Sequence, residues 1–247
     1  MRLIACTLLF SAANAKQPAP LWTGATLQGR VRLVGRPAKL TALKVTMDEA
    51  ACGKTAPNER LIVGPGGGVK NAVVWLDAIE DAPRPSPKTA RLDQKACVFV
   101  PHVQVVPVGS RLDLYNSDRV AHSVQAHHLE SDATLFSVAL PPAKGHKPRP
   151  QQLKEPGIVE LRCGAEHGWS SAFIHVAEHP WYAVTDEAGR FEIRDAPSGE
   201  WVLRVWHESW QVVREDPLEW GPPVLLQREI STRIGPPTIV DFELRDF

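Results

Sequence analysis

The chain has 247 residues, of which 43% are hydrophobic and 23% are charged, a balance that supports a folded core and excludes a largely disordered chain. Its 28 basic and 28 acidic residues cancel, so the basic excess typical of nucleic-acid-binding proteins is missing. The 22 prolines disfavour long helices and favour short strands joined by loops. Four cysteines remain to be explained.

The first residues have the pattern of a secretory signal peptide. Arg2 precedes an apolar stretch at 3–10, and small residues follow up to Ala15, as in a cleavable export segment. We therefore predict a signal peptide over residues 1–15 and a periplasmic or secreted protein. The alternatives are a lipid anchor at Cys6 and a buried N-terminal strand. No later apolar run reaches the roughly 18 residues that a membrane-spanning helix needs, so no membrane span is predicted.

The cysteine count suggests two different roles. Export would remove Cys6 and leave Cys52, Cys97 and Cys163. In an oxidising compartment, an odd number of cysteines suggests one disulfide and one thiol with another purpose. Three pairings are possible, and composition does not choose among them.

Short stretches of alternating apolar residues predict strands in three blocks. The first block has strands at 26–34, 43–47 and 72–76, the second at 103–108, 111–115, 120–125, 157–163 and 172–176, and the third at 191–194, 201–206, 224–227 and 238–245. Proline-rich segments at 81–88 and 141–150 are expected to be linkers or loops. No segment keeps a 3.6-residue period over ten or more residues, so the predicted fold class is all-β.

Alternation places a histidine and a cysteine on the interior faces of two of these strands. His122 shares a face with Val124, and Cys163 shares a face with Leu161, because every second side chain of a strand points the same way. By the same rule Glu160 is expected to face solvent. Taken alone, a cysteine at a strand end is most often a small buried hydrophobe.

A third residue changes this interpretation. His167 follows Cys163 by four positions, just past an expected turn at 164–165. Two imidazoles and one thiolate form a soft, trigonal donor set, which suits copper that cycles between Cu(I) and Cu(II). A β-sandwich would supply the rigidity that such a site needs.

These elements resemble a known family. Residues 97–177 resemble the cupredoxins of the plastocyanin, azurin and pseudoazurin type. The similar elements are Pro101-His102-Val103, Val108-Gly109, Asn116-Ser117-Asp118 with His122, and Pro156-Gly157 leading to Cys163 and His167. The resemblance implies a Greek-key β-sandwich in which His122, Cys163 and His167 bind one copper ion.

The resemblance is closer to a bacterial subgroup labelled methylamine-utilization or plastocyanin-like proteins. There, a segment similar to residues 179–186 follows the copper motif and leads into a sandwich of the carboxypeptidase-regulatory or transthyretin-like type. Gly189-Arg190-Phe191 and, near the other end, Gly29-Arg30-Val31 resemble that sandwich. The resemblance thus implies a discontinuous outer domain over 21–85 with 179–247, and a cupredoxin domain over 90–178.

Two positions depart from the subgroup pattern. A methionine usually follows the last histidine, but the only methionine left after export is Met47, and Gln125 stands where a second histidine is usual. The axial position is therefore open to Gln125, Glu166, a backbone carbonyl, water or nothing. His102 is a candidate ligand or neighbour of the ligands, and Trp169 is a candidate to shield the copper or to face an electron partner.

The resemblance also implies a disulfide, because it assigns Cys163 to copper and leaves Cys52 and Cys97 to each other. Loop closure by such a bond would contribute about 4 kcal/mol of stability. Among the other histidines, His127 and His128 are weaker ligand candidates, His207 is expected to be structural, and His146, His175 and His179 are expected at the surface.

The sequence thus predicts a periplasmic copper protein that transfers single electrons, with no enzymatic activity. An exposed His167 would be the exit for the electron, toward an unidentified redox or copper-exchange protein partner. Three alternatives remain: copper trafficking or storage, a zinc enzyme that uses the same ligands with Glu166 as base, and a metal-free binding module.

Overall fold

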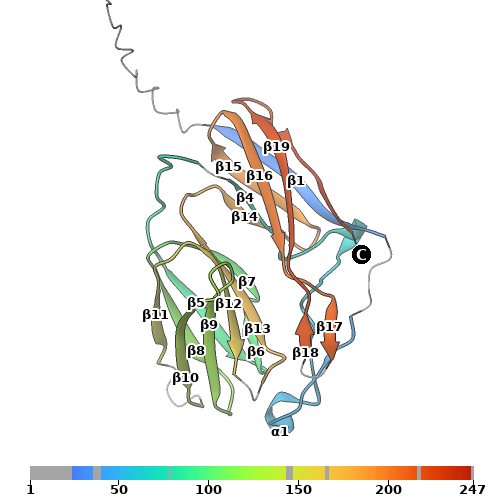
Figure 1. Ribbon diagram of the computed structural model, residues 1–247, viewed down its shortest axis with the longest axis vertical. Coiled ribbons are helices and arrows are strands. Elements are labelled where there is room, and N and C mark those ends of the chain that lie inside the picture. The colour runs from blue at the N-terminus through green and yellow to red at the C-terminus, as the bar shows by residue number, and fades with distance from the viewer. Residues whose placement is uncertain are drawn as a thin grey trace, which may run out of the picture.

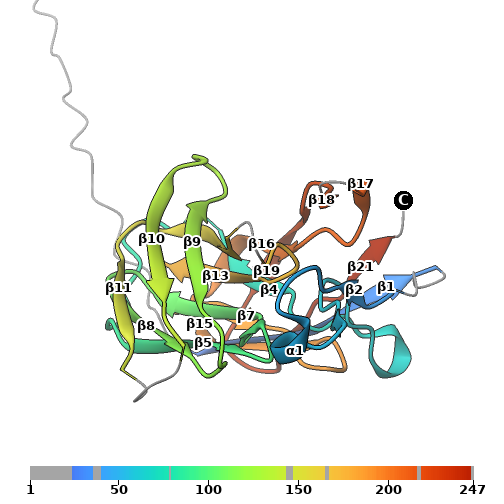
Figure 2. The same ribbon diagram turned by 90° about the horizontal axis from the view of Figure 1, so that it is seen from below.

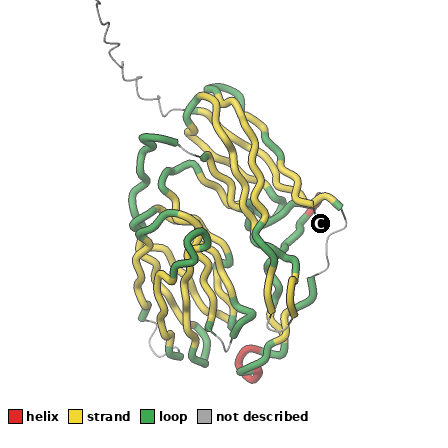
Figure 3. The backbone as a smooth tube through the Cα atoms, in the orientation of Figure 1, coloured by secondary structure: helices red, strands yellow, loops and turns green. Residues whose placement is uncertain are grey.

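The computed structural model describes residues 24–35, 40–77, 79–142, 147–164, 167–215 and 218–245. Figure 3 shows that regular structure in these residues is almost entirely strand, with one short helix, α1 (Glu49–Cys52), and one 3-10 turn, η1 (Pro65–Gly67). The all-β prediction is confirmed. The predicted signal peptide at 1–15 lies outside the described residues. Among the described residues, no helix has the length and apolar character needed to cross a membrane.

The middle of the chain forms two sheets around one hydrophobic core (Figure 1). The first sheet, in the order β10-β9-β12-β13-β7, consists of β7 (Val103–Pro107), β9 (His122–His128), β10 (Thr134–Leu140), β12 (Gly157–Cys163) and β13 (Ser171–Ala177). The second, in the order β11-β8-β5-β6, consists of β5 (Thr89–Lys95), β6 (Val98–Val100), β8 (Ser110–Asn116) and β11 (Arg149–Leu153). The pairs β7–β13 and β5–β8 are parallel, and the others are antiparallel.

Segments from both ends of the chain build a second pair of sheets around a separate core. One sheet, in the order β14-β4-β16-β19, consists of β4 (Val73–Leu76), β14 (Tyr182–Val184), β16 (Gly199–His207) and β19 (Val224–Thr232). In the other, β1 (Ala25–Val34) pairs with β15 (Arg190–Ala196), β20 (Thr238–Ile239) and β21 (Phe242–Arg245). Strand β1 (blue) therefore lies beside strands from the last quarter of the chain (Figure 1).

Two small hairpins complete the described structure. They are β2 (Leu43–Lys44) with β3 (Thr55–Ala56), and β17 (Val212–Glu215) with β18 (Leu218–Trp220). Helix α1 lies between β2 and β3 in the chain, and Figure 2 shows it beside the sheet that contains β7.

An aromatic cluster joins the two pairs of sheets. Trp75 of β4 and Trp206 of β16 pack with Ile158 of β12 and Phe173 of β13, and the Phe173 and Trp206 ring centroids lie 5.0 Å apart. All four side chains are less than 10% exposed. The two pairs of sheets thus share a buried apolar contact.

Differences from the predicted strands have local causes. Strand β5 was not predicted because its buried positions include the polar Asp93 and Gln94, which hide the apolar alternation. Strand β11 runs partly through the predicted loop 141–150, and its Pro150 is tolerated because β11 is an edge strand. The predicted strand 238–245 is two strands, β20 and β21.

Candidate metal centre

His122 and Cys163 lie on neighbouring antiparallel strands. His122 is the first residue of β9, and Cys163 is the last residue of β12, where it pairs with Val124. The burial pattern of β9 places His122 and Val124 on the inner face, as alternation predicts. Both candidate ligands therefore come from the same end of the same sheet.

A tight turn after β12 returns His167 to this end of the sheet. The His167 N–H donates to the Gly164 carbonyl at 3.1 Å, and the Ser170 N–H donates to the His167 carbonyl at 2.9 Å. On the other side, the Gly164 N–H donates to Ser123 of β9. These bonds place the imidazole of His167 beside the thiol of Cys163.

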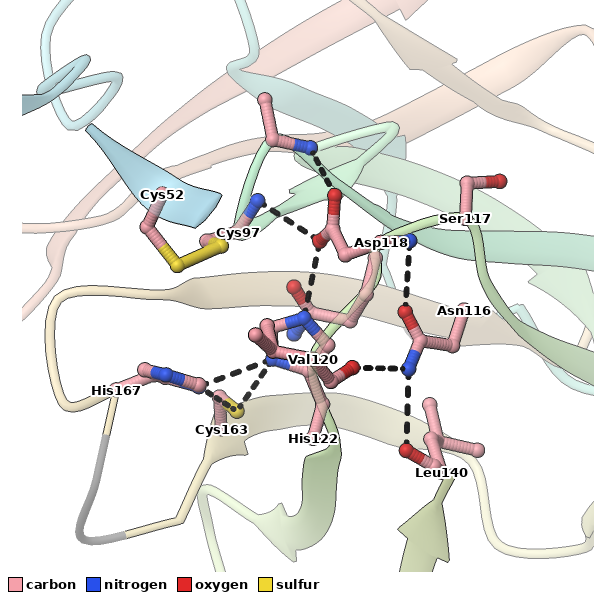
Figure 4. A network of polar contacts seen from close by, with 12 residues as sticks. Cys52, Cys97, Asn116, Ser117, Asp118, Val120, His122, Leu140, Cys163 and His167 are labelled. Atoms are coloured by element: carbon pink, nitrogen blue, oxygen red, sulfur yellow. Dashed lines mark hydrogen bonds and ion pairs between the residues drawn. A yellow bond between two sulfur atoms is a disulfide. The ribbon is translucent and has the colours of Figure 1, made fainter. Parts of the chain in front are cut away.

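The three side chains bring one nitrogen each from two imidazoles and one sulfur into a compact triangle (Figure 4). The Nδ1 atoms of His122 and His167 lie 3.0 Å apart, and Cys163 Sγ lies 3.5 and 3.6 Å from them. An ion at the centre would lie about 2 Å from each atom, close to the bond lengths of a first-row metal to nitrogen and sulfur. The donors therefore fit a single ion of that size.

A carboxylate holds the outer nitrogen of each imidazole. Asp118 Oδ2 lies 2.9 Å from Nε2 of His122, and Asp48 Oδ2 lies 3.0 Å from Nε2 of His167. Such bonds leave Nδ1 of each ring directed at the metal position and raise its basicity as a ligand. From the sequence, Asp118 is part of the Asn116-Ser117-Asp118 motif but has no assigned function, and no sequence pattern points to Asp48.

Asp118 is itself fixed by the loop that precedes β9. Burial would raise the pKa of Asp118, but His122 and the N–H groups of Cys97 and Ala96 together lower it below its usual value. Asn116 orders the same loop: its side-chain amide donates to the carbonyls of Val120, Leu140 and Pro141 at 2.9, 3.1 and 3.0 Å. The charged form of Asp118 is therefore favoured beside His122.

The predicted disulfide between Cys52 and Cys97 is present and lies beside the candidate metal centre (Figure 4). It packs in a small cluster with Val45, Ala56 and Trp169. The Trp169 indole donates to the Cys97 carbonyl at 3.1 Å, and its ring centroid lies 5.0 Å from that of His167. Trp169 thus shields one side of His167, a role considered for it in the sequence.

The expected exposure of His167 is wrong. Its exposed fraction is 1%, against 4% for His122 and 3% for Cys163. The segment that carries Asp48 and Cys52 covers the ring edge that was expected to reach solvent. Because this segment lies more than 100 residues earlier in the chain, local sequence could not reveal the cover.

Neither Gln125 nor His102 reaches the triangle. Gln125 is exposed on β9, on the opposite face from His122, because it lies an odd number of positions, three, further along the strand. Glu166 lies outside the described residues. His102 is buried elsewhere: its ring contacts the Ser171 carbonyl and the carboxylate of Glu208.

His102 belongs to a buried charge cluster between the two pairs of sheets. Glu208 accepts from His102 and forms an ion pair with Arg60 at 3.1 Å. Burial would lower the pKa of His102, but the adjacent Glu208 carboxylate raises it above its usual value. Glu160 lines a pocket together with Arg60 and Glu208 and is 5% exposed, so its expected position in solvent is also wrong.

Two other histidines expected at the surface are buried. His175 and His179 are 5% and 6% exposed and contact Tyr182 with ring centroids 4.9 and 4.6 Å away. Burial lowers the pKa of His175 to about 3 and that of His179 to about 4. His128 is buried as well, with Nε2 against the Pro156 carbonyl at 2.7 Å. These rings serve packing between strands.

Comparisons with known proteins bear on the fold. No protein-family profile and no curated protein match the chain. A purple cupredoxin from Nitrosopumilus maritimus is 20% identical and covers 36% of this chain and 99% of its own, with a TM-score of 0.30. An amicyanin variant is 15% identical over 41% of this chain and 87% of its own, with a TM-score of 0.31.

The similar structures include an enzyme. A copper-containing nitrite reductase from Thermus scotoductus is 20% identical over 42% of this chain and 25% of its own, with a TM-score of 0.29. The interpretation of the metal centre depends on its own geometry.

Proposed function

We propose that this protein binds one copper ion through His122, Cys163 and His167 and transfers single electrons. The observation that supports it is the triangle of two Nδ1 atoms and one Sγ atom, with separations of 3.0, 3.5 and 3.6 Å. A soft thiolate with two imidazoles in a trigonal arrangement suits both Cu(I) and Cu(II). The ion would supply the redox change, and the protein would hold its ligands in place.

The surroundings of the three ligands favour electron transfer, because a rigid site changes little between oxidation states. Each imidazole is held by a carboxylate at about 3 Å, and Asn116 orders the loop before β9 through three carbonyl groups. All three ligands are at most 4% exposed. Packing and hydrogen bonds of this kind lock side-chain positions.

Copper trafficking or storage is the second candidate. Its supporting observation is the 1% exposure of His167, because a covered ligand hinders the approach of a redox partner to the metal. A storage protein would bind Cu(I) tightly without a reversible redox couple, whereas an electron carrier would cycle reversibly.

Organisation and location belong to the same proposal. We place the copper centre in a cupredoxin domain over 90–178, carried by a sandwich of the carboxypeptidase-regulatory type over 21–85 with 179–247. The two separate cores draw their residues from these respective parts of the chain. The disulfide is consistent with an oxidising compartment such as the periplasm, where a redox or copper-exchange partner would be met.

Loading the purified protein with Cu(II) tests the proposal. We expect one equivalent of copper by metal analysis and an intense visible absorption band from the thiolate–copper bond. Cys163→Ser should lose the band, while the control His127→Ala, on the outer face of β9, should keep it. A band retained in Cys163→Ser would overturn the assignment, and voltammetry of the loaded protein would separate electron transfer from storage.

A further inference from the structure

We propose that residues 43–56 form a cap that closes the copper centre and that the disulfide Cys52–Cys97 keeps this cap shut. Reduction of the disulfide would open the cap and allow the metal to exchange. This inference rests on the proposed copper function, and it assigns a role to Asp48 as the residue through which the cap holds His167.

The cap is a compact unit with its own hydrogen bonds. Strands β2 and β3 pair at its base, and the Val45 N–H donates to the Lys54 carbonyl at 3.1 Å. Within it, the N–H groups of Ala51 and Cys52 both donate to the Asp48 carbonyl, at 2.8 and 2.9 Å. The cap can therefore move as a body rather than residue by residue.

Asp48 connects the cap to the metal ligand. Its backbone is in the left-handed region, with φ of 55°, a conformation that aspartate tolerates better than most residues. From there its carboxylate reaches Nε2 of His167 at 3.0 Å. The Asp48 side chain is 40% exposed and that of His167 is 1% exposed, so this carboxylate stands between the imidazole and solvent.

The disulfide ties the cap to the loop that holds the other histidine. Cys97 is fully buried, and its N–H donates at 2.9 Å to the same Asp118 oxygen that contacts His122. One end of the cap thus contacts His167 through Asp48, and the other is covalently joined beside the support of His122. Apolar contacts add to these ties: Leu43, Val45 and Ala56 of the cap share one small cluster with Val98, Val120 and Trp169.

Opening would require a dithiol reductant. One thiolate of the dithiol would attack the sulfur of Cys52, because Cys52 is the more exposed residue of the pair at 9% against 0%, and Cys97 would leave as thiolate. The second thiol of the dithiol would then release Cys52. In total, the dithiol gives two electrons and two protons and becomes a disulfide, and the protein gains two thiols.

The first test measures copper transfer. Protein loaded with Cu(I) is mixed with excess bathocuproine disulfonate, and the absorbance of the chelator complex is followed. Asp48→Asn should transfer copper about 10- to 100-fold faster than the wild type, because loss of a carboxylate behind a histidine ligand typically lowers metal affinity by that factor. The double variant Cys52→Ser with Cys97→Ser should also transfer copper faster than the wild type. The control is Glu49→Gln, an exposed change on the same turn, which should leave the rate unchanged.

The absorption spectrum of the Cu(II) form distinguishes loss of the cap contact in Asp48→Asn from a general disturbance of the copper centre. If Asp48 acts by holding the cap, Asp48→Asn keeps the wild-type absorption band of the Cu(II) form while the transfer rate rises. Equal transfer rates in wild type, Asp48→Asn and the double variant would overturn the cap, even if copper binding itself is demonstrated.

The second test needs no metal. Hydrogen exchange of the copper-free protein, followed by mass spectrometry, reports on the bonded N–H groups of Val45, Ala51, Cys52 and Gly53. Dithiothreitol should accelerate their exchange by about tenfold or more, to the level of the double serine variant, without changing exchange in β16 and β19. Unchanged protection of the cap after reduction would refute the proposal that the disulfide keeps the cap closed, whether or not the protein binds copper.

Discussion

Asp118 contacts His122 at Nε2, 2.9 Å away, while Nδ1 of the same ring faces the Cys163 sulfur at 3.5 Å. The imidazole is therefore held from one side and presents its free nitrogen to the other. Asp118 in turn accepts from the N–H groups of Ala96 and Cys97. A single carboxylate thus links the disulfide-bearing turn to a proposed metal ligand.

Asp118→Asn should weaken copper binding without unfolding the protein. The amide keeps the shape of the side chain but loses the negative charge that supports His122, and loss of such a partner typically lowers metal affinity by about 10- to 100-fold. Competition with a Cu(II) chelator gives the affinity. Asp132→Asn, an exposed change in the turn between β9 and β10, is the control, and equal affinities would contradict the role of Asp118.

Asn116→Ala should destabilise the protein and disorder the loop before β9. The carbonyl groups of Val120, Leu140 and Pro141 lose their donor, and that of Leu140 is buried, which we expect to lower the free energy of unfolding by about 2–4 kcal/mol. Urea unfolding of the copper-free protein measures this change. Asn116→Asp retains an acceptor for the Asp118 N–H but removes the amide donor. A free energy of unfolding equal to that of the wild type in this variant would show that the bonds to the three carbonyl groups do not contribute to stability.

Glu208→Gln should destabilise the contact between the two pairs of sheets. Burial would raise the pKa of Glu208, but His102 and Arg60 lower it, so the native side chain is charged. Neutralising it leaves the buried Arg60 guanidinium without its counterion and removes the charge beside His102, at a cost of about 3–5 kcal/mol.

Chemical denaturation measures the effect of Glu208→Gln. In the control Glu219→Gln, the ion pair with Arg214 is half-exposed, and the change should be below about 1 kcal/mol. The copper spectrum should be the same in both variants, since His102 contacts none of the three metal ligands. A neutral effect of Glu208→Gln on stability would contradict the charge assignment.

His175 should make the protein less stable in acid. Burial lowers its pKa to about 3, whereas an unfolded chain has the ordinary histidine value of about 6.5. Below pH 6.5 the unfolded state therefore binds more protons, and stability that is fully present above that pH is lost as the pH falls toward 3. One such group changes the free energy of unfolding by about 1.4 kcal/mol per pH unit.

The variant His175→Phe removes this titrating group from between the rings of Trp75 and Tyr182. Urea unfolding at pH 6, 5 and 4 should show a pH slope that is shallower than wild type by about 1.4 kcal/mol per unit. His127→Gln, a half-exposed change on β9, serves as the matched control. A slope equal to that of the wild type would show that His175 is not buried in its neutral form.

Several features could be predicted from local sequence. Alternation along β12 and β9 indicated that Cys163 and His122 face inward, because side chains of a strand alternate regardless of what packs on them. Alternation failed for Glu160, which is buried by residues of the other pair of sheets. The surface positions expected for His175 and His179 were also wrong, because these rings pack against Trp75 of β4 and Tyr182 of β14.

Local sequence was enough to infer the all-β class, the inward direction of two candidate ligands and the position of His167 shortly after Cys163, because each depends on backbone periodicity or short spacing. The contact of Asp48 with His167, 119 residues away, and the closure of the His167 ring from solvent could be seen in the folded chain alone. Contacts between distant segments follow from the packing of complete sheets, which leaves no pattern in the local sequence.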